Sequence, residues 1–171
     1  MNFEKVLAYD VLEGAQSQYV EEMSEKYDLE IEGKSGPREV AENADVLVNA
    51  TKEMTNPVGK KEWLDRKGIL VCPLVGATYW YPEAINSMDK IYVDDIDQYL
   101  SFWGDREGYP DESSIFGEIG EVIIGKKKGR ENNKEKIMTI NEGLAIEDIS
   151  VGKEVYDLAK EKNIGKKIEL F

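Results

Sequence analysis

The chain has 171 residues, of which 41% are hydrophobic and 33% charged, and this balance fits one globular domain with its own core. Its formal net charge of −13 argues against binding to nucleic acids or anionic membranes, which requires basic surfaces. With no histidine and one cysteine, the sequence excludes histidine-based catalytic devices and an internal disulfide, and it disfavours a zinc site.

The first apolar run, residues 5–9, predicts a buried strand that ends at Asp10. A helix over residues 14–27 and a short strand over residues 29–32 are expected next. The inner face of this helix is expected to carry Ala15, Tyr19, Met23 and Tyr27. In a dinucleotide-binding βαβ unit, such an acid binds the ribose hydroxyls, and a glycine-rich turn lies about 20 residues upstream. Only nine residues precede Asp10, so either the acid is incidental or a nucleotide-binding fold starts here at its second strand.

Three further apolar runs predict strands over residues 46–51, 69–74 and 91–93. A brief helix that begins at Pro37 precedes the first of them. Strands buried on both faces and separated by helical stretches indicate a parallel sheet covered by helices. The sequence therefore predicts an α/β fold, Rossmann-like, with helices on both faces of the sheet but without the first strand and the glycine-rich loop.

After about residue 95 the pattern becomes mainly helical. The expected elements are helices over residues 96–103, 113–124 and 143–162, with short strands over 137–140 and 168–171. The last helix is expected to turn inward Leu144, Ala145, Ile149, Gly152, Tyr156 and Ala159. We expect one domain over residues 1–171, with the sheet core in about residues 1–95 and a helical C-terminal part in about residues 96–171.

Candidate binding residues lie where the predicted strands end, because ligands of parallel α/β sheets bind at the carboxyl ends of the strands. Asp10 would bind ribose and favour NAD over NADP, since a carboxylate repels a 2′-phosphate; otherwise it caps a helix or turn. Thr51 could hydrogen-bond a cofactor or simply cap its strand. Gly76 permits close backbone approach at a strand end, although a glycine there is more often only a turn.

Two other features have structural interpretations that we favour over functional ones. Asp94, Asp95 and Asp97 could suggest a magnesium site, but acids between a strand and a helix usually cap the helix. The lysine run over residues 126–128 could bind phosphate, but it is more typical of an exposed loop.

Two later motifs carry a resemblance to a known family. The stretch 116–130, FGEIGEVIIGKKKGR, is followed by NEGLAIED at residues 141–148. Together they resemble the paired C-terminal signature of the ornithine cyclodeaminase/mu-crystallin family, and the likeness extends over essentially all 171 residues. Asp10 then falls on the family's ribose-binding acid.

The resemblance implies a bilobed enzyme that holds a nicotinamide cofactor, NAD, and acts on amino or imino acids by cyclodeamination or by dehydrogenation and reduction. Positions that match cofactor-binding residues are Asp10, Thr51, Val75, Gly76, Ala77 and Asn141. Glu142 matches a residue whose backbone borders the substrate. The sequence itself has no signal-peptide pattern and no apolar run near the ~20 residues that a membrane span needs, so we expect a cytoplasmic protein without a membrane or nucleic-acid partner.

Two departures from the family pattern bear on activity. Thr78 stands where ornithine cyclodeaminases have a catalytic aspartate, which speaks against ornithine cyclisation and leaves the catalytic residue unknown. The family's N-terminal substrate lobe is also absent from the sequence. We therefore expect an inactive half that needs that lobe or a separate subunit, and a homo-oligomer that buries Val6, Leu7, Val46 or Val48. The alternative is a non-catalytic remnant that acts as a protein-interaction module.

Overall fold

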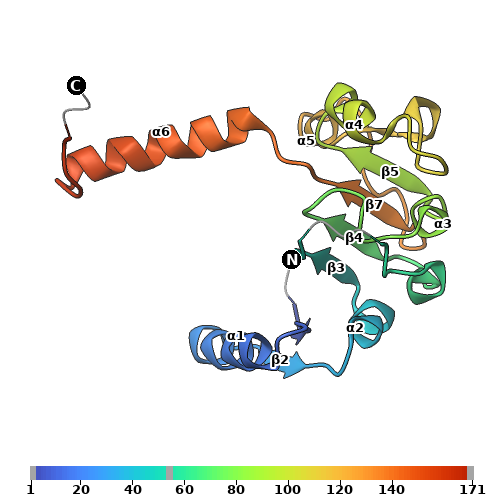
Figure 1. The fold of residues 1–171 in the computed structure, drawn as a ribbon, viewed down its shortest axis with the longest axis horizontal. Coiled ribbons are helices and arrows are strands. Elements are labelled where there is room, and N and C mark those ends of the chain that lie inside the picture. The colour runs from blue at the N-terminus through green and yellow to red at the C-terminus, as the bar shows by residue number, and fades with distance from the viewer. Residues whose placement is uncertain (1–2, 53–55, 169–171) are drawn as a thin grey trace.

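The computed structural model describes residues 3–52 and 56–168, and its main feature is a five-stranded parallel sheet (Figure 1). The strand order is β3 (Val46–Asn49), β4 (Leu70–Pro73), β7 (Ile137–Ile140), β5 (Lys90–Val93) and β6 (Gly117–Glu118). β7 thus pairs with β4 on one side and β5 on the other, so the stretch after residue 95 supplies the middle strand. Because all neighbours are parallel, the carboxyl ends of the strands lie along one edge.

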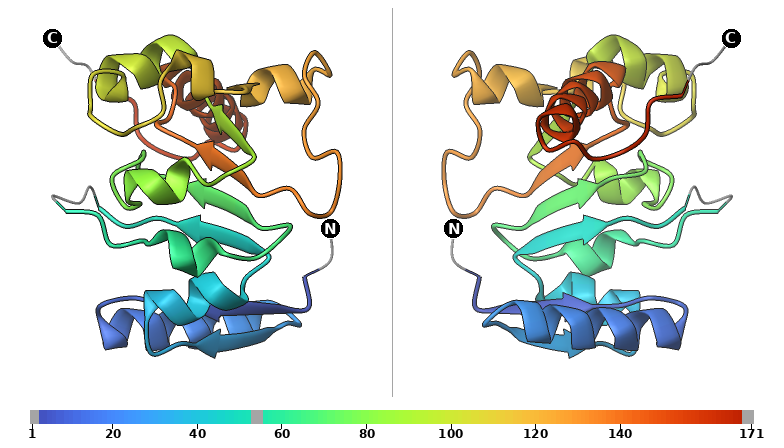
Figure 2. Two further views of the ribbon diagram at one scale, coloured as in Figure 1. Left: turned by 90° about the vertical axis from the view of Figure 1, so that its right-hand side faces the viewer. Right: turned by 90° about the vertical axis from the view of Figure 1, so that its left-hand side faces the viewer.

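A second, two-stranded parallel sheet contains β1 (Lys5–Ala8) and β2 (Glu30–Gly33), connected by α1 (Glu13–Lys26). Among the described residues, β1 pairs only with β2 and β3 only with β4. The small sheet lies beyond the β3 edge, and its strands run in the same direction as β3 (Figure 2). In the Rossmann strand order 3-2-1-4, β2, β1 and β3 correspond to strands three, two and four. The position of strand one, between β1 and β3, is not filled by any strand of the described residues. This arrangement confirms the predicted Rossmann-like fold without its first strand.

The hydrophobic core lies between the five-stranded sheet and α2 (Pro37–Asn43), the 3-10 turn η1 (Lys61–Leu64), α3 (Pro82–Ile85) and α4 (Ile96–Trp103). Its fully buried side chains include Leu64, Ile69, Val71, Trp80, Ile85, Val93, Tyr99, Met138 and Ile140. Figure 1 shows α2 and α3 on one side of the strands and α1 on the other. α2 and α3 both have proline in the first turn, where the missing amide hydrogen costs nothing.

Two predictions were wrong in this part of the fold: the helix over residues 113–124 and most of the inner face of α1. The predicted helix over 113–124 is divided into a 3-10 turn, η2 (Glu112–Ser114), the strand β6 and the short helix α5 (Ile119–Ile123). The predicted helix is interrupted because Gly117 and Glu118 form a strand that pairs with β5. In α1 the half-buried side chains are Gln16, Val20 and Met23, whereas Ala15, Tyr19 and Tyr27 are exposed.

The last helix, α6 (Ala145–Glu161), extends away from the sheet (Figure 1). None of its residues is buried, so the prediction that one face of this helix packs inward is wrong within the described residues. Its exposed apolar side chains are Ile146, Ile149, Val151, Val155, Tyr156 and Leu158. The strand expected over residues 168–171 lies almost wholly outside the described residues. No helix in the described part of the chain has the length and apolarity that a membrane span requires.

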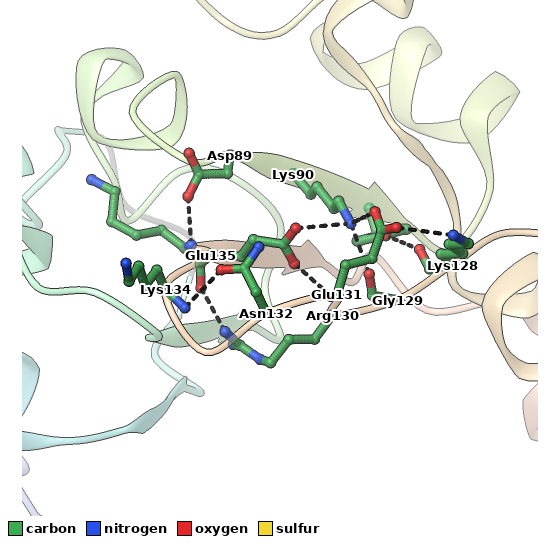
Figure 3. A network of polar contacts seen from close by, with 11 residues as sticks. Asp89, Lys90, Lys128, Gly129, Arg130, Glu131, Asn132, Lys134 and Glu135 are labelled. Atoms are coloured by element: carbon green, nitrogen blue, oxygen red, sulfur yellow. Dashed lines mark hydrogen bonds and ion pairs between the residues drawn. The ribbon is translucent and has the colours of Figure 1, made fainter.

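A network around Lys90 fixes the loop that leads into β7 (Figure 3). The ammonium group of Lys90, which is 7% exposed, lies 2.7 Å from Glu131 Oε2, 3.3 Å from Glu135 Oε1 and 2.9 Å from the Gly129 carbonyl oxygen. Its hydrogen bond to Glu131 raises the pKa of Lys90 and lowers that of Glu131. The Glu131 amide donates to Glu135 and lowers the pKa of that carboxyl.

We expect Lys90→Met to lower the free energy of unfolding by about 2 kcal/mol, because it leaves two carboxylates and a carbonyl without their shared donor. Urea denaturation of the whole chain measures this. The matched control is Lys128→Met, because the 80%-exposed Lys128 side chain forms an exposed ion pair with Glu131, and its loss should change stability by less than about 0.5 kcal/mol. Equal losses in the two variants would contradict the role of Lys90.

The same network predicts an acid-dependent loss of stability. An acid whose pKa is lowered by folding stabilises the fold above its ordinary pKa of 4.5, and this contribution is lost as pH falls through the folded-state value. The unfolding free energy of the wild type should therefore fall more steeply than that of Lys90→Met as the pH drops below about 4.5. Identical slopes in urea titrations at several pH values would refute this assignment.

Candidate functional site

Asp10 follows β1 at the carboxyl edge of the small sheet. Its Oδ1 accepts a hydrogen bond from the Leu12 amide at 2.7 Å, and its own amide donates to Gln16 Oε1 at 3.1 Å. The exposed carboxylate lies in a surface hollow whose lining includes Tyr9, Asp10, Glu13, Gln16, Lys34 and Ser35. The acid is therefore accessible and has a fixed backbone, as a ligand for a diol requires.

Gln16 connects the ends of β1 and β2. Besides its contact with Asp10, its Nε2 donates to the Lys34 carbonyl oxygen at 3.2 Å. Gly33 makes room for this link, because a Cβ at that position would lie 2.6 Å from Gln16 Nε2. Gln16 was not predicted from the sequence. Its position in the first turn of α1, six residues after Asp10, was a usable signal.

Lys34 is the basic side chain of this hollow, and two acids hold it. Its ammonium group lies 2.7 Å from Glu32 Oε2 and 3.3 Å from Glu39 Oε1. The hydrogen bond with Glu32 raises the pKa of Lys34, and Lys34 in turn lowers the pKa of Glu32 to about 2. The positive charge beside Asp10 is thus compensated within the chain.

At the end of β3, Asn49 and Thr51 flank the unfilled strand position. Asn49 Oδ1 accepts from the indole of the buried Trp80 at 2.9 Å, while Asn49 Nδ2 is buried with no hydrogen-bond partner among the described residues. Thr51 is half-buried, and its hydroxyl donates to the Lys52 carbonyl oxygen at 3.3 Å. A buried amide donor without a partner is costly, and a bound ligand would satisfy it.

The loop after β4 contains Val75, Gly76, Ala77 and Thr78. Gly76 has φ +67°, and a Cβ there would lie 2.5 Å from Glu142 Oε1, so both its conformation and its surroundings require glycine. Its amide donates to the Asn141 carbonyl oxygen at 3.3 Å, which joins this loop to the end of β7. Ala77 and Thr78 are buried.

Asn141 and Glu142 leave β7 directly beside this loop. Asn141 Nδ2 donates to the Thr139 carbonyl oxygen at 2.6 Å and to that of Pro73 at 3.2 Å. Glu142 Oε1 accepts from the Trp103 indole at 2.5 Å. Its backbone amide donates to Asp94 Oδ2 at 2.7 Å, and the Gly143 amide donates to the same oxygen at 2.6 Å.

Of the acidic cluster, Asp95 has the capping role favoured from the sequence, whereas Asp94 has a different structural role. Asp95 accepts from the Gln98 amide at 2.7 Å and caps α4, while Asp94 binds the two amides after β7. No group of side chains in the described ranges is arranged to hold a metal ion. Trp103 and the anchoring role of Asp94 could not be foreseen, because their partners are about 40 residues or more away in the sequence.

The structure brings the residues after β4 and β7 together, and places Asp10 in the separate small sheet. Figure 2 shows the small sheet beyond the β3 edge, with its strands running in the same direction as β3. Burial raises the pKa of Tyr79, and the nearby Tyr9 phenol from the end of β1 adds to this rise. The candidate site therefore runs along one edge of both sheets and is interrupted where a strand is unfilled.

Comparison with known proteins agrees with this geometry. The ornithine cyclodeaminase/mu-crystallin family model matches residues 1–163, and the chain belongs to that family. An alanine dehydrogenase of Archaeoglobus fulgidus is 35% identical over 98% of this chain and 52% of its own length. A Δ1-pyrroline-2-carboxylate reductase of Thermococcus litoralis, solved with NADH and L-proline, is 32% identical with a TM-score of 0.81, over 96% of this chain and 53% of that one.

A third similar protein is an archaeal alanine dehydrogenase dimer with bound NAD, which is 32% identical with a TM-score of 0.82 over 98% of this chain and 53% of that one. The chain thus spans about half the length of the relatives it matches. The recognised family and the Rossmann-like architecture are confirmed. The roles of individual site residues stay predictions.

Proposed function

We propose that this chain is the NAD-binding half of an enzyme that oxidises amino acids or reduces imino acids, and that it is inactive without a substrate-binding half. The observation that carries the proposal is the alignment of Asp10, Thr51, the Val75–Ala77 loop and Asn141 along one carboxyl edge of parallel strands. This is the edge at which Rossmann-like sheets bind dinucleotides.

The residues of this edge suit NAD. The accessible Asp10 carboxylate would accept hydrogen bonds from the two ribose hydroxyls. Asn49 Nδ2, which is buried and has no partner among the described residues, would donate to a polar atom of the cofactor. Gly76 would let its backbone come close to a flat ring. When bound, the nicotinamide accepts a hydride from the carbon that bears the amino group, or returns one to an imine carbon.

Thr78 favours dehydrogenation or reduction over cyclodeamination. A neutral, buried hydroxyl cannot exchange protons near neutral pH as a tuned carboxylate does. Hydride transfer to or from the cofactor needs no carboxylate at this position, provided that another group handles the nitrogen proton. We assign that task and the recognition of the substrate carboxylate to the half that this chain does not cover.

A second candidate function, a protein-interaction module without catalysis, is favoured by the exposed apolar side chains of α6. Large exposed apolar side chains on one helix are typical of a segment that packs on another protein segment. The two functions differ in nucleotide binding, which only the first requires.

Cofactor choice should depend on the Lys34 ion pairs. We expect NAD to bind more tightly than NADP, because Asp10 repels a 2′-phosphate while Glu32 and Glu39 occupy the nearby ammonium group. The double variant Glu32→Gln/Glu39→Gln frees Lys34 and should raise NADP affinity relative to NAD by about ten-fold. Isothermal titration with both nucleotides measures the ratio. The control is Glu42→Gln, which removes the Arg38 ion pair and leaves those of Lys34 in place. An unchanged ratio of NADP to NAD affinity in the double variant would exclude Lys34 as a determinant of cofactor choice.

Activity should require the uncovered half. The chain alone should show no turnover, whereas a fusion that places the uncovered half of the Archaeoglobus alanine dehydrogenase before residue 1 should oxidise L-alanine with NAD or reduce Δ1-pyrroline-2-carboxylate with NADH. Absorbance of NADH at 340 nm reports both reactions. Neither form should make proline from ornithine. Proline formation from ornithine by either form, or absence of NAD binding by the fusion, would overturn the proposal.

A further inference from the structure

The half-buried side chain of Glu142 is held in place from several parts of the chain. Its Oε1 accepts a hydrogen bond from the Trp103 indole at 2.5 Å, and its backbone amide donates to Asp94 Oδ2 at 2.7 Å. A Cβ on Gly76 would lie 2.5 Å from Glu142 Oε1 and 2.7 Å from Oε2. Both carboxylate oxygens therefore lie directly against this glycine. A carboxylate that is fixed at its backbone and at its tip is preorganised to bind a ligand.

Trp103, which orients the Glu142 carboxylate, is itself fixed by its neighbours. Its side chain is buried, and the Tyr109 ring packs against it with 5.3 Å between the ring centroids. The Arg106 guanidinium lies over the indole, 4.2 Å from the ring centroid, which is a favourable cation–π arrangement. An indole N–H is a neutral donor, so its hydrogen bond orients the carboxylate and does not cancel the negative charge.

The charged groups around this carboxylate are mainly acidic. Asp94 is a second acid that binds the same stretch of backbone, and Arg106 is the basic group on the far side of the indole. Burial raises the pKa of Tyr99, and the charges of Glu142 and Asp111 add to this rise, so Tyr99 is a neutral phenol at ordinary pH. A balance of this kind favours a cationic ligand over an anionic one.

The proposed reaction identifies which cationic group of the substrate lies near Glu142. Under the proposed function the nicotinamide ring lies at the Gly76 loop, and the reacting carbon must be in contact with that ring for hydride transfer. The substrate nitrogen is bonded to this carbon, so its distance from the ring is fixed by the reaction. The Glu142 carboxylate lies against the same loop, and Glu142 matches a residue whose backbone borders the substrate.

We propose that the Glu142 carboxylate binds the cationic nitrogen of the substrate, which is the ammonium group of an amino acid or the iminium group of an imino acid. This inference rests on the proposed NAD-binding function and adds a specificity-determining residue to it. It requires substrates that carry a positive charge on the reacting nitrogen, and it disfavours the corresponding hydroxy acids, whose hydroxyl is neutral.

The charge of Glu142 would also assist the reaction itself. In oxidation the ammonium first loses a proton to a group of the uncovered half. The hydride then leaves the carbon for the nicotinamide, while the nitrogen lone pair forms the C=N bond and the nitrogen becomes positive. In reduction the hydride returns to the iminium carbon and the electron pair of the π bond returns to nitrogen. A carboxylate beside this nitrogen stabilises its positive charge in both directions.

Ligand binding without turnover tests the charge contact. L-Alanine has an ammonium group where L-lactate has a neutral hydroxyl, and the two are otherwise alike. The fusion with the uncovered half of the Archaeoglobus alanine dehydrogenase, loaded with NADH, cannot oxidise either ligand. Glu142→Gln keeps an oxygen acceptor for the Trp103 indole but removes the charge. It should lower the ratio of L-alanine to L-lactate affinity at least about ten-fold, as measured by isothermal titration.

The matched control is Glu147→Gln, which removes the same charge from an exposed carboxylate in the first turn of α6 and should leave the affinity ratio unchanged. The pH profile adds a readout that a purely structural role would not change. A negative charge within about 4–6 Å raises the pKa of a cationic nitrogen by about one unit or more. In reduction of Δ1-pyrroline-2-carboxylate, the alkaline decline of kcat should therefore begin about one pH unit lower in Glu142→Gln than in the wild type or Glu147→Gln.

The results also distinguish this inference from the proposed function. Equal affinity ratios and equal pH profiles in Glu142→Gln and Glu147→Gln, in a fusion that binds NAD and turns over, would overturn the role of Glu142 and leave the function standing. A parallel loss of L-alanine and L-lactate affinity in Glu142→Gln would overturn it as well, because the carboxylate would then only support the loop. A wild-type fusion that binds no NAD would overturn both.

Discussion

The pairing requirement of parallel strands governs this structure. Each residue in such a strand presents its amide and carbonyl groups to one neighbour, so a strand with one neighbour has half of its backbone groups unpaired. In this chain β4, β7 and β5 have neighbours on both sides, and the core is built around them. β1 and β3 lack neighbours at the position where a Rossmann sheet has its first strand. The division into two sheets follows from that single unfilled position.

The candidate site depends on the same constraint. Parallel strands bring the ends of β3, β4 and β7 to one edge, and hydrogen bonds between the following loops fix their side chains there. The Gly76 amide binds the Asn141 carbonyl oxygen, and Asp94 holds the amides of Glu142 and Gly143. Asp10 belongs to the same edge by topology, but its sheet is a separate one. The residues of the proposed dinucleotide site are thus divided between the two sheets.

Charge in the small sheet is arranged locally. Lys34 is neutralised by Glu32 and Glu39 and is linked through its carbonyl oxygen to Gln16, which also holds the Asp10 backbone. Under the proposed function, a ribose-binding acid next to a free ammonium group would tolerate a phosphate. The ion pairs would then affect cofactor choice more than stability, because exposed ion pairs contribute little to the folding free energy.

The sequence by itself determined the strands β1, β3, β4, β5 and β7 and the helices α1, α2, α4 and α6, because apolar runs and their periodicity are local signals. Paired motifs near the C-terminus determined the family. Only the tertiary structure decided that β7 is the middle strand and that residues 117–118 pair with β5 instead of continuing a helix. It also decided that the apolar side chains of α6 are not buried within the described residues. It also decided that Gln16, Asp94 and Trp103 support the site. These features depend on contacts between residues far apart in the chain, and neither periodicity nor local propensity contains information about such contacts.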